Sequence, residues 1–163
     1  HQPVLMKEVI QHLIPSYISM TDSQKQVINQ NEQKYWFVDC TFGNGGYTFE
    51  LLNKSANFHV ISFEIDHQVK PFVDSISHHF NHQNSTNLWN SNGNEFSYNE
   101  ILNNKRFHFI LDNFSNIGKH VKYRNLDNNQ IDGIVFDLGV SSMQIDTAER
   151  GFVGLSVYKC CQH

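Results

Sequence analysis

Hydrophobic residues recur along the chain in short runs that polar, turn-forming segments separate. Four runs are short and rich in aromatic and β-branched residues, which is typical of strands. Between them, apolar residues return every three or four positions, which is typical of helices that bury one face. The pattern predicts strands at 35–38, 59–65, 106–111 and 131–136, and helices at 8–13, 47–54, 69–80 and 117–123.

Strands that alternate with helices indicate an α/β fold with a parallel sheet and right-handed crossovers. A polar residue follows each predicted strand at the point where the strand ends. These residues are Asp39, Glu64, Asn113 and Asp137. Because parallel strands end at the same edge of a sheet, the four positions are expected to line one pocket, which is where open α/β sheets bind ligands.

The composition of the chain limits the classes of protein to which it can belong. The length of 163 residues suits one domain, and hydrophobic residues (39%) and charged residues (17%) are both scarce. The net charge of −4 disfavours a protein that holds nucleic acid mainly through phosphates, unless the basic surface lies elsewhere. No apolar run approaches the roughly 20 residues of a membrane span, so no membrane partner is expected.

Two polar stretches interrupt the predicted elements. The first, at 16–34, is rich in glutamine and asparagine and is interpreted as an insertion or linker. The second, at 81–104, holds nine asparagines and few residues to bury, and is interpreted as a flexible insertion. Three cysteines make no disulfide framework, and Cys160, Cys161 and His163 lack zinc-ligand spacing, so no metal is expected.

The first predicted strand runs into a glycine-rich turn at Gly43, Gly45 and Gly46. Glycines let a ligand approach the backbone closely, and the next helix offers free N–H groups. The dinucleotide fingerprint G-x-G-x-x-G fits at its first two glycines, but its third position is Thr48. The turn also lacks the Gly-Lys-Ser/Thr ending of a triphosphate-binding loop. A dinucleotide site therefore stays open at this point, whereas a triphosphate site is disfavoured.

Acidic strand ends narrow the choice of ligand. Glu64 lies 25 residues after Asp39, where an acid can accept hydrogen bonds from both ribose hydroxyls of NAD or of S-adenosylmethionine. Asp66 competes for this role, and a solvated strand-end acid is the plain alternative. Asp39 suits a cationic ligand better than a pyrophosphate, which favours S-adenosylmethionine, although it can equally tie down its own glycine turn. Phe114 either lies against adenine or packs in the core.

The loop that starts at Asp137 carries the most varied polar groups, with small residues, an amide, further acids and an arginine. A structural loop seldom needs so many kinds of polar group, so a site is favoured over a helix-capping turn formed by Ser141 and Ser142.

Several short motifs are distributed along the chain from His1 to Phe152. They are His1-x-Pro3-Val4-Leu5-x-x-Glu8-Val9, Asp39-x-Thr41-x-Gly43-x-Gly45-Gly46, Glu64-x-Asp66, Phe114-Ser115, and Asp137-Leu138-Gly139-Val140-Ser141-Ser142-x-Gln144-x-Asp146-x-x-Glu149-Arg150-Gly151-Phe152. Together they resemble the MraW/RsmH family of S-adenosylmethionine-dependent methyltransferases, which modify N4 of a cytosine in small-subunit ribosomal RNA. The glycine turn is shared by many methyltransferases, whereas the last motif is highly specific.

The resemblance implies a class I methyltransferase fold, a Rossmann-like parallel sheet that is incomplete here. It also implies S-adenosyl-L-methionine as cofactor and small-subunit ribosomal RNA as partner, and it leaves the catalytic base unassigned. Tyr47 stands where the family usually has histidine, Glu64 where it has aspartate, and Met143 where proline is usual. The implied cofactor contacts are Gly45, Gly46, Tyr47, Glu64, Phe114, Asp137 and Gln144, to which the chemistry of the turn adds Asp39 and Gly43.

Beyond Gly151-Phe152 the chain departs from the family pattern. Residues 1–152 are therefore expected to be the N-terminal part of a methyltransferase domain, and 153–163 a divergent tail of a truncated product that lacks the RNA-binding surface. A non-catalytic remnant, and less so an NAD-binding oxidoreductase fragment, stay as alternatives. The family serves bacterial-type ribosomes, and asparagine-rich insertions are atypical of compact bacterial enzymes, so a mitochondrial or cytoplasmic location is expected.

Overall fold

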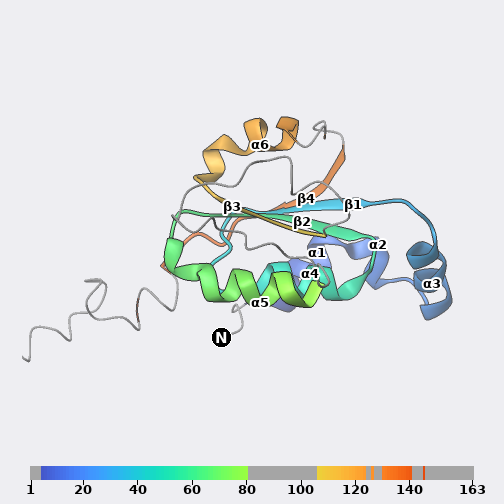
Figure 1. Ribbon diagram of the computed structural model, residues 1–163. Coiled ribbons are helices and arrows are strands. Elements are labelled where there is room, and N and C mark those ends of the chain that lie inside the picture. The colour runs from blue at the N-terminus through green and yellow to red at the C-terminus, as the bar shows by residue number, and fades with distance from the viewer. Residues whose placement is uncertain (1–4, 81–105, 124–125, 127–129, 141–144, 146–163) are drawn as a thin grey trace, which may run out of the picture.

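The computed structural model describes residues 5–80, 106–123, 126, 130–140 and 145 (Figure 1). Every predicted strand and helix is present within two residues of its expected bounds. The second predicted insertion, at 81–104, and the tail at 153–163 lie outside the described residues. The elements are α1 (Met6–Leu13), α2 (Pro15–Ile18), α3 (Asp22–Gln30), β1 (Tyr35–Asp39), α4 (Gly46–Lys54), β2 (Phe58–Glu64), η1 (His67–Val69), α5 (Lys70–Phe80), β3 (Phe107–Leu111), η3 (Phe114–Asn116), α6 (Ile117–Tyr123) and β4 (Ile131–Val135).

The four strands form one parallel sheet in the order β3-β2-β1-β4. On one side β1 pairs with β2, and on the other it pairs with β4 after an irregularity between Trp36 and Phe37. Figure 1 shows α1, α4 and α5 on one face of the sheet and α6 on the opposite face. The predicted α/β class with a Rossmann-like parallel sheet is therefore confirmed. No described helix has both the length and the apolar character needed to cross a membrane.

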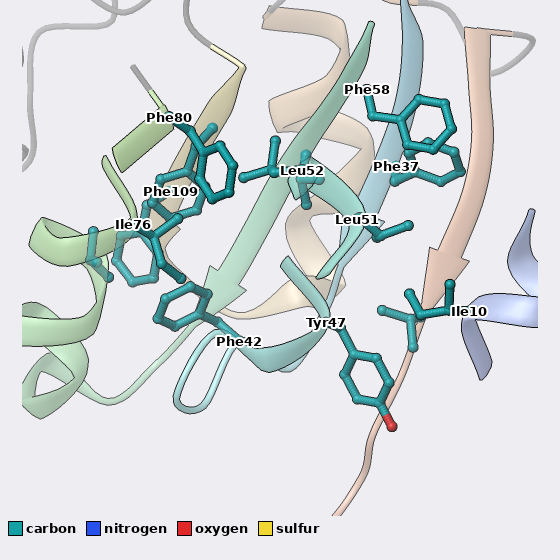
Figure 2. Close-up of a cluster of buried hydrophobic side chains, with 14 of the residues drawn as sticks. Ile10, Phe37, Phe42, Tyr47, Leu51, Leu52, Phe58, Ile76, Phe80 and Phe109 are labelled. Atoms are coloured by element: carbon teal, nitrogen blue, oxygen red, sulfur yellow. The ribbon is translucent and has the colours of Figure 1, made fainter. Parts of the chain in front are cut away.

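Two apolar clusters hold the sheet between its helices. Successive side chains of a strand point to opposite faces, so each central strand supplies both clusters. Figure 2 shows part of the cluster on the α4 side, where Phe37 and Phe58 pack near Leu51 and Leu52. Burial on both faces explains why β1 and β2 read as nearly continuous apolar runs. The cluster on the α6 side is built from Val38, Cys40, Ile61, Phe63 and Ile110.

The strand β4 is less buried than its sequence suggests. It lies at one edge of the described sheet, and its residues alternate between partly buried and exposed until Val135. Ile134 is 44% exposed, and Phe136, which follows the strand, is 52% exposed. The prediction of a buried strand was therefore wrong for these positions, because no described strand covers the outer side of β4.

The polar stretch at 16–34 is folded and contains part of α2 and all of α3. A capping box starts α3, in which the Thr21 N–H donates to Gln24 Oε1 over 2.8 Å and the Gln24 N–H donates to Thr21 Oγ1. At the other end, Asn57 Nδ2 donates to the carbonyl oxygens of Ile28 and Asn31 at 2.7 and 2.8 Å. A linker was therefore the wrong expectation for this stretch, whereas its status as an insertion stays a prediction.

Arg106 connects the start of β3 to the last turn of α4, the loop that follows it and the start of β2. Its guanidinium donates to the carbonyl oxygens of Leu52, Ser55 and Phe58. The guanidinium carbon also lies 5.5 Å from the centre of the Phe80 ring. Burial lowers the pKa of this group, and the three carbonyl oxygens replace the water that it loses.

Candidate functional site

The carboxyl ends of the strands meet at one edge of the sheet, and direct hydrogen bonds join their loops. The Asp137 N–H donates to Thr41 Oγ1 over 2.7 Å, which links the loop after β4 to the loop after β1. The Gly43 N–H donates to Glu64 Oε2 over 3.0 Å, which links the loop after β1 to the end of β2. The gathering of sequence-distant polar residues, predicted from the parallel order, is therefore present.

Asp39 ends β1 and is completely buried. Its Oδ1 accepts a hydrogen bond from the Thr41 N–H at 3.2 Å, and its Oδ2 accepts one from the Thr48 hydroxyl at 2.7 Å. Burial raises the pKa of the carboxyl to about 6, the bonds from Thr48 and Thr41 oppose the rise, and the charge of Glu64 adds to it. Asp39 thus holds its own glycine turn, which was one of its two predicted roles, and its direct contact with a ligand stays a prediction.

Thr48 connects this carboxyl to the neighbouring strand. Its Oγ1 lies 2.7 Å from Ser62 Oγ on β2, and both side chains are fully buried. The hydroxyl of Thr48 stands where the dinucleotide fingerprint has its third glycine, and a glycine there would remove the donor to Asp39. The departure from the fingerprint therefore has a structural reason. Neither Thr48 nor Ser62 was predicted as part of the site, although a hydroxyl in the first turn after a strand-end acid was a readable signal.

Two glycines of the turn have left-handed backbones, for different reasons. Gly43 has φ of 52°, and a Cβ there would meet nothing closer than an oxygen at 3.9 Å. Gly45 has φ of 78°, and a Cβ there would lie 2.4 Å from the Ile76 side chain and 2.9 Å from the Phe42 ring. Gly43 therefore leaves its backbone open to a ligand, whereas packing requires glycine at position 45. Gly46 begins α4 without a side-chain cap at Gly45, and the uncapped start of a helix can offer N–H groups to a ligand.

Glu64 is the acid of β2 that faces the glycine turn. Besides the Gly43 N–H, its carboxylate accepts hydrogen bonds from the N–H groups of Ile65 and Asp66 at 2.9 and 3.1 Å. Asp66, the predicted competitor, is buried, and its side chain accepts from the Gln68 N–H at the start of η1. The geometry therefore favours Glu64 over Asp66 as the acid available at the sheet edge.

Tyr47 brings a hydroxyl from α4 towards the end of β4. Its side chain is buried, and Figure 2 shows the ring near Ile10 with the hydroxyl pointing away from the other labelled side chains. Burial raises the pKa of this phenol, and the charges of Asp137 and Asp39 raise it further. Asp137 itself is exposed. Tyr47 thus stays a neutral hydrogen-bond donor at neutral pH, within electrostatic reach of an accessible carboxylate.

Phe114 begins η3 after β3 and is half-buried. Its ring meets that of Phe136 with centres 5.4 Å apart and planes nearly perpendicular, at 83°. The turn is fixed by Asp112, whose carboxylate accepts from Asn116 Nδ2 at 3.0 Å and lies 2.8 Å from Nε2 of the buried His120. The hydrogen bond with His120 lowers the pKa of Asp112. Neither Phe136 nor His120 was among the predicted site residues.

Most of the residues predicted to contact the cofactor lie within the part of the chain that the structure describes. Gln144 lies outside the described residues, as do Ser141 and Ser142 of the alternative capping turn. The other predicted residues lie at the carboxyl edge of the sheet or in the turn beside it, and their contacts with a cofactor stay predictions. They are Asp39, Gly43, Gly45, Gly46, Tyr47, Glu64, Phe114 and Asp137.

Comparison with known proteins matches residues 1–154 to a family described as the MraW methylase family. A "Ribosomal RNA small subunit methyltransferase H" from Ehrlichia ruminantium (strain Gardel) is 34% identical over 152 residues, 93% of this chain and 36% of that protein. A protein of the same name from Orientia tsutsugamushi (strain Boryong) is 34% identical over 93% of this chain and 35% of its own length. A solved rRNA methylase from Streptococcus thermophilus shares 18% identity over 61% of this chain and 46% of its own, with a TM-score of 0.34. The chain thus spans about 36% of the length of the first of these relatives.

Proposed function

The chain belongs to the MraW methylase family, and on that premise we propose that it carries the S-adenosylmethionine site of a methyltransferase acting on small-subunit ribosomal RNA. One observation within the fold supports this proposal most. Glu64 and Asp137 lie at the same sheet edge: the Glu64 carboxylate accepts from the Gly43 N–H of the glycine turn, and the backbone N–H of Asp137 donates to Thr41 Oγ1 beside that turn.

The residues at this edge fit S-adenosylmethionine better than a dinucleotide. The cofactor carries an ammonium and a sulfonium, which the exposed Asp137 carboxylate attracts, whereas a pyrophosphate would be repelled by a carboxylate at this position. The Glu64 carboxylate, which already accepts from three N–H groups, would accept a further hydrogen bond from a ribose hydroxyl, and Phe114 would lie against the adenine.

The proposed reaction is methylation of a cytosine at N4. When bound, the cofactor supplies an electrophilic methyl group on its sulfonium. Transfer of that methyl group to the cytosine nitrogen would leave S-adenosylhomocysteine and release one amine proton to water, while Glu64 and Asp137 would hold the cofactor at the sheet edge. The chain would contribute by positioning the cofactor, since the Asp39–Thr48–Ser62 network fixes the glycine turn. Alignment of the reacting atoms can supply much of the rate enhancement of an enzyme.

RNA recognition is proposed to lie mainly beyond these residues. The chain has a net charge of −4, while proteins that grip phosphates use basic surfaces. Because it spans about 36% of the length of a relative, the rest of such a protein has room for the RNA contacts. We also propose a mitochondrial or cytoplasmic location, which fractionation of the source cells would decide.

Calorimetric titration of the chain with S-adenosylhomocysteine and, separately, with NAD tests the proposal. We expect heat with the first ligand only, loss of that heat in Asp137→Ala, and no change in Asp74→Ala, which removes an exposed carboxylate of α5. Binding of NAD alone would favour the oxidoreductase alternative. Binding of neither ligand would favour the non-catalytic remnant and refute the cofactor site.

A further inference from the structure

Two aromatic rings meet above the sheet although their strands lie at opposite edges. In the order β3-β2-β1-β4, Phe114 follows one outer strand and Phe136 follows the other. Their ring centres are nevertheless only 5.4 Å apart. The loops after β3 and β4 must therefore lean towards each other across the ends of β2 and β1, where Glu64 and Asp39 lie.

Phe136 is held in place but is not covered. The Asp137 N–H next to it is fixed to Thr41 Oγ1 at 2.7 Å, which anchors this point of the chain to the glycine turn. The side chain of Phe136 is still 52% exposed, and Phe114 is only half-buried. A large aromatic side chain that is anchored and left open offers a surface for another apolar group.

The end of β4 thus carries an aromatic side chain towards the α6 side of the sheet edge and a carboxylate towards the α4 side. Phe136 packs with Phe114, which belongs to the apolar cluster on the α6 side. Asp137 acts electrostatically on Tyr47, which belongs to the cluster on the α4 side. A ligand that lies across the edge would therefore meet an aromatic corner at one end and a carboxylate at the other.

We propose that Phe136 is a second binding residue for the purine base of the cofactor, forming with Phe114 a corner that holds a planar heterocycle. This inference rests on the proposed function and deepens it. Perpendicular rings let one ring stack on the base while the other contacts its edge, and both arrangements are favourable for aromatic groups. The corner selects a flat aromatic group by shape and stacking, and the charged end of the ligand is directed to Asp137.

Affinity for S-adenosylhomocysteine in the whole chain, measured by calorimetry, tests this role. Stacking of a base on an aromatic side chain is strong enough that Phe136→Leu should weaken binding about tenfold. Phe136→Tyr keeps the ring and should stay within about threefold of the unchanged chain. Ile134→Ala removes an equally accessible apolar side chain of β4 that is 44% exposed, and should leave the affinity unchanged.

A double-substitution cycle sharpens the test. Because both rings would contact one base, Phe114→Leu combined with Phe136→Leu should weaken binding by less than the product of the two single effects. Urea unfolding without ligand shows that each variant is folded. Equal affinity of the leucine and tyrosine variants at position 136 would overturn this proposal while the proposed function stands. Absence of binding by the unchanged chain would overturn both.

Discussion

Replacing Asp39 with asparagine should stabilise the folded chain at neutral pH. Burial raises the pKa of this carboxyl from its ordinary value of 3.8 to about 6, so the folded state holds the proton more tightly than the unfolded state does. Below the unfolded value both states are protonated. Between the two values only the unfolded state ionises, so the free energy of unfolding falls as pH rises, and above about pH 6 the loss is complete.

The size of this loss follows from the same pKa values. A rise from 3.8 to about 6 corresponds to at most about 3 kcal/mol. Asparagine avoids the loss and preserves the shape of the network, since its oxygen can accept from the Thr41 N–H and its amide can donate to the Thr48 hydroxyl. Thr48 can then donate to Ser62 Oγ, which lies 2.7 Å away. After allowance for the loss of charged hydrogen bonds, Asp39→Asn should gain roughly 1–2 kcal/mol at pH 7 and almost nothing at pH 4.

Urea unfolding followed by tryptophan fluorescence from pH 4 to pH 8 measures this difference. Comparing the variant with the unchanged chain at each pH cancels the contribution of titrating groups that do not interact with Asp39. Asp74→Asn is the matched control, because Asp74 is an exposed carboxylate of α5 paired with Lys70 and such pairs contribute little. A stability difference for Asp39→Asn that does not grow between pH 4 and pH 6 would refute the reasoning, as would a variant that is less stable at pH 7.

Three further predictions concern the supports of the site. Gly45→Ala should lower the free energy of unfolding by roughly 2–4 kcal/mol, because its Cβ would lie 2.4 Å from Ile76 in a left-handed backbone, and an unchanged urea midpoint would contradict this. Arg106→Lys should lower the free energy of unfolding by about 2 kcal/mol in the same assay, since one ammonium cannot reach all three carbonyl oxygens that the guanidinium bonds. An unchanged free energy of unfolding would show that these three bonds are dispensable. His120→Leu should weaken S-adenosylhomocysteine binding several-fold in calorimetry by freeing Asp112, and His120→Gln, which keeps a donor, should restore it. Equal affinity of these two variants would assign His120 to packing alone.

The elements of this fold were predictable because their signals are local. Alternation and three-to-four spacing belong to each segment by itself, so strand and helix bounds followed from the sequence within two residues. The burial of β4 did not follow, because whether a strand lies at an edge depends on its neighbours and not on its own residues. The helix α3 was mistaken for a linker because it buries no side chain fully, although Thr21 and Gln24 carried a readable capping box.

The sequence predicted where the site lies in the fold, but it did not predict most of the side-chain contacts within the site. The strand-end rule located Asp39, Glu64 and Asp137 at one edge, since parallel order alone decides that. It did not reveal that Asp39 is closed off by Thr48, because this contact depends on how α4 docks against the sheet. The sequence predicted Phe136 within a buried strand. Its contact with Phe114, which follows the strand at the opposite edge of the sheet, cannot be deduced from the spacing of the two residues in the sequence.

The three hydrogen bonds that Glu64 accepts depend on the length of its side chain. A carboxylate offers about four lone-pair positions, and the N–H groups of Gly43, Ile65 and Asp66 occupy three of them. A side chain that is shorter by one carbon–carbon bond of about 1.5 Å, such as aspartate, would lose its reach to Gly43. Because the donor is the backbone N–H of Gly43, which any residue except proline would supply, the length of the side chain at position 64 decides whether the two loops are joined.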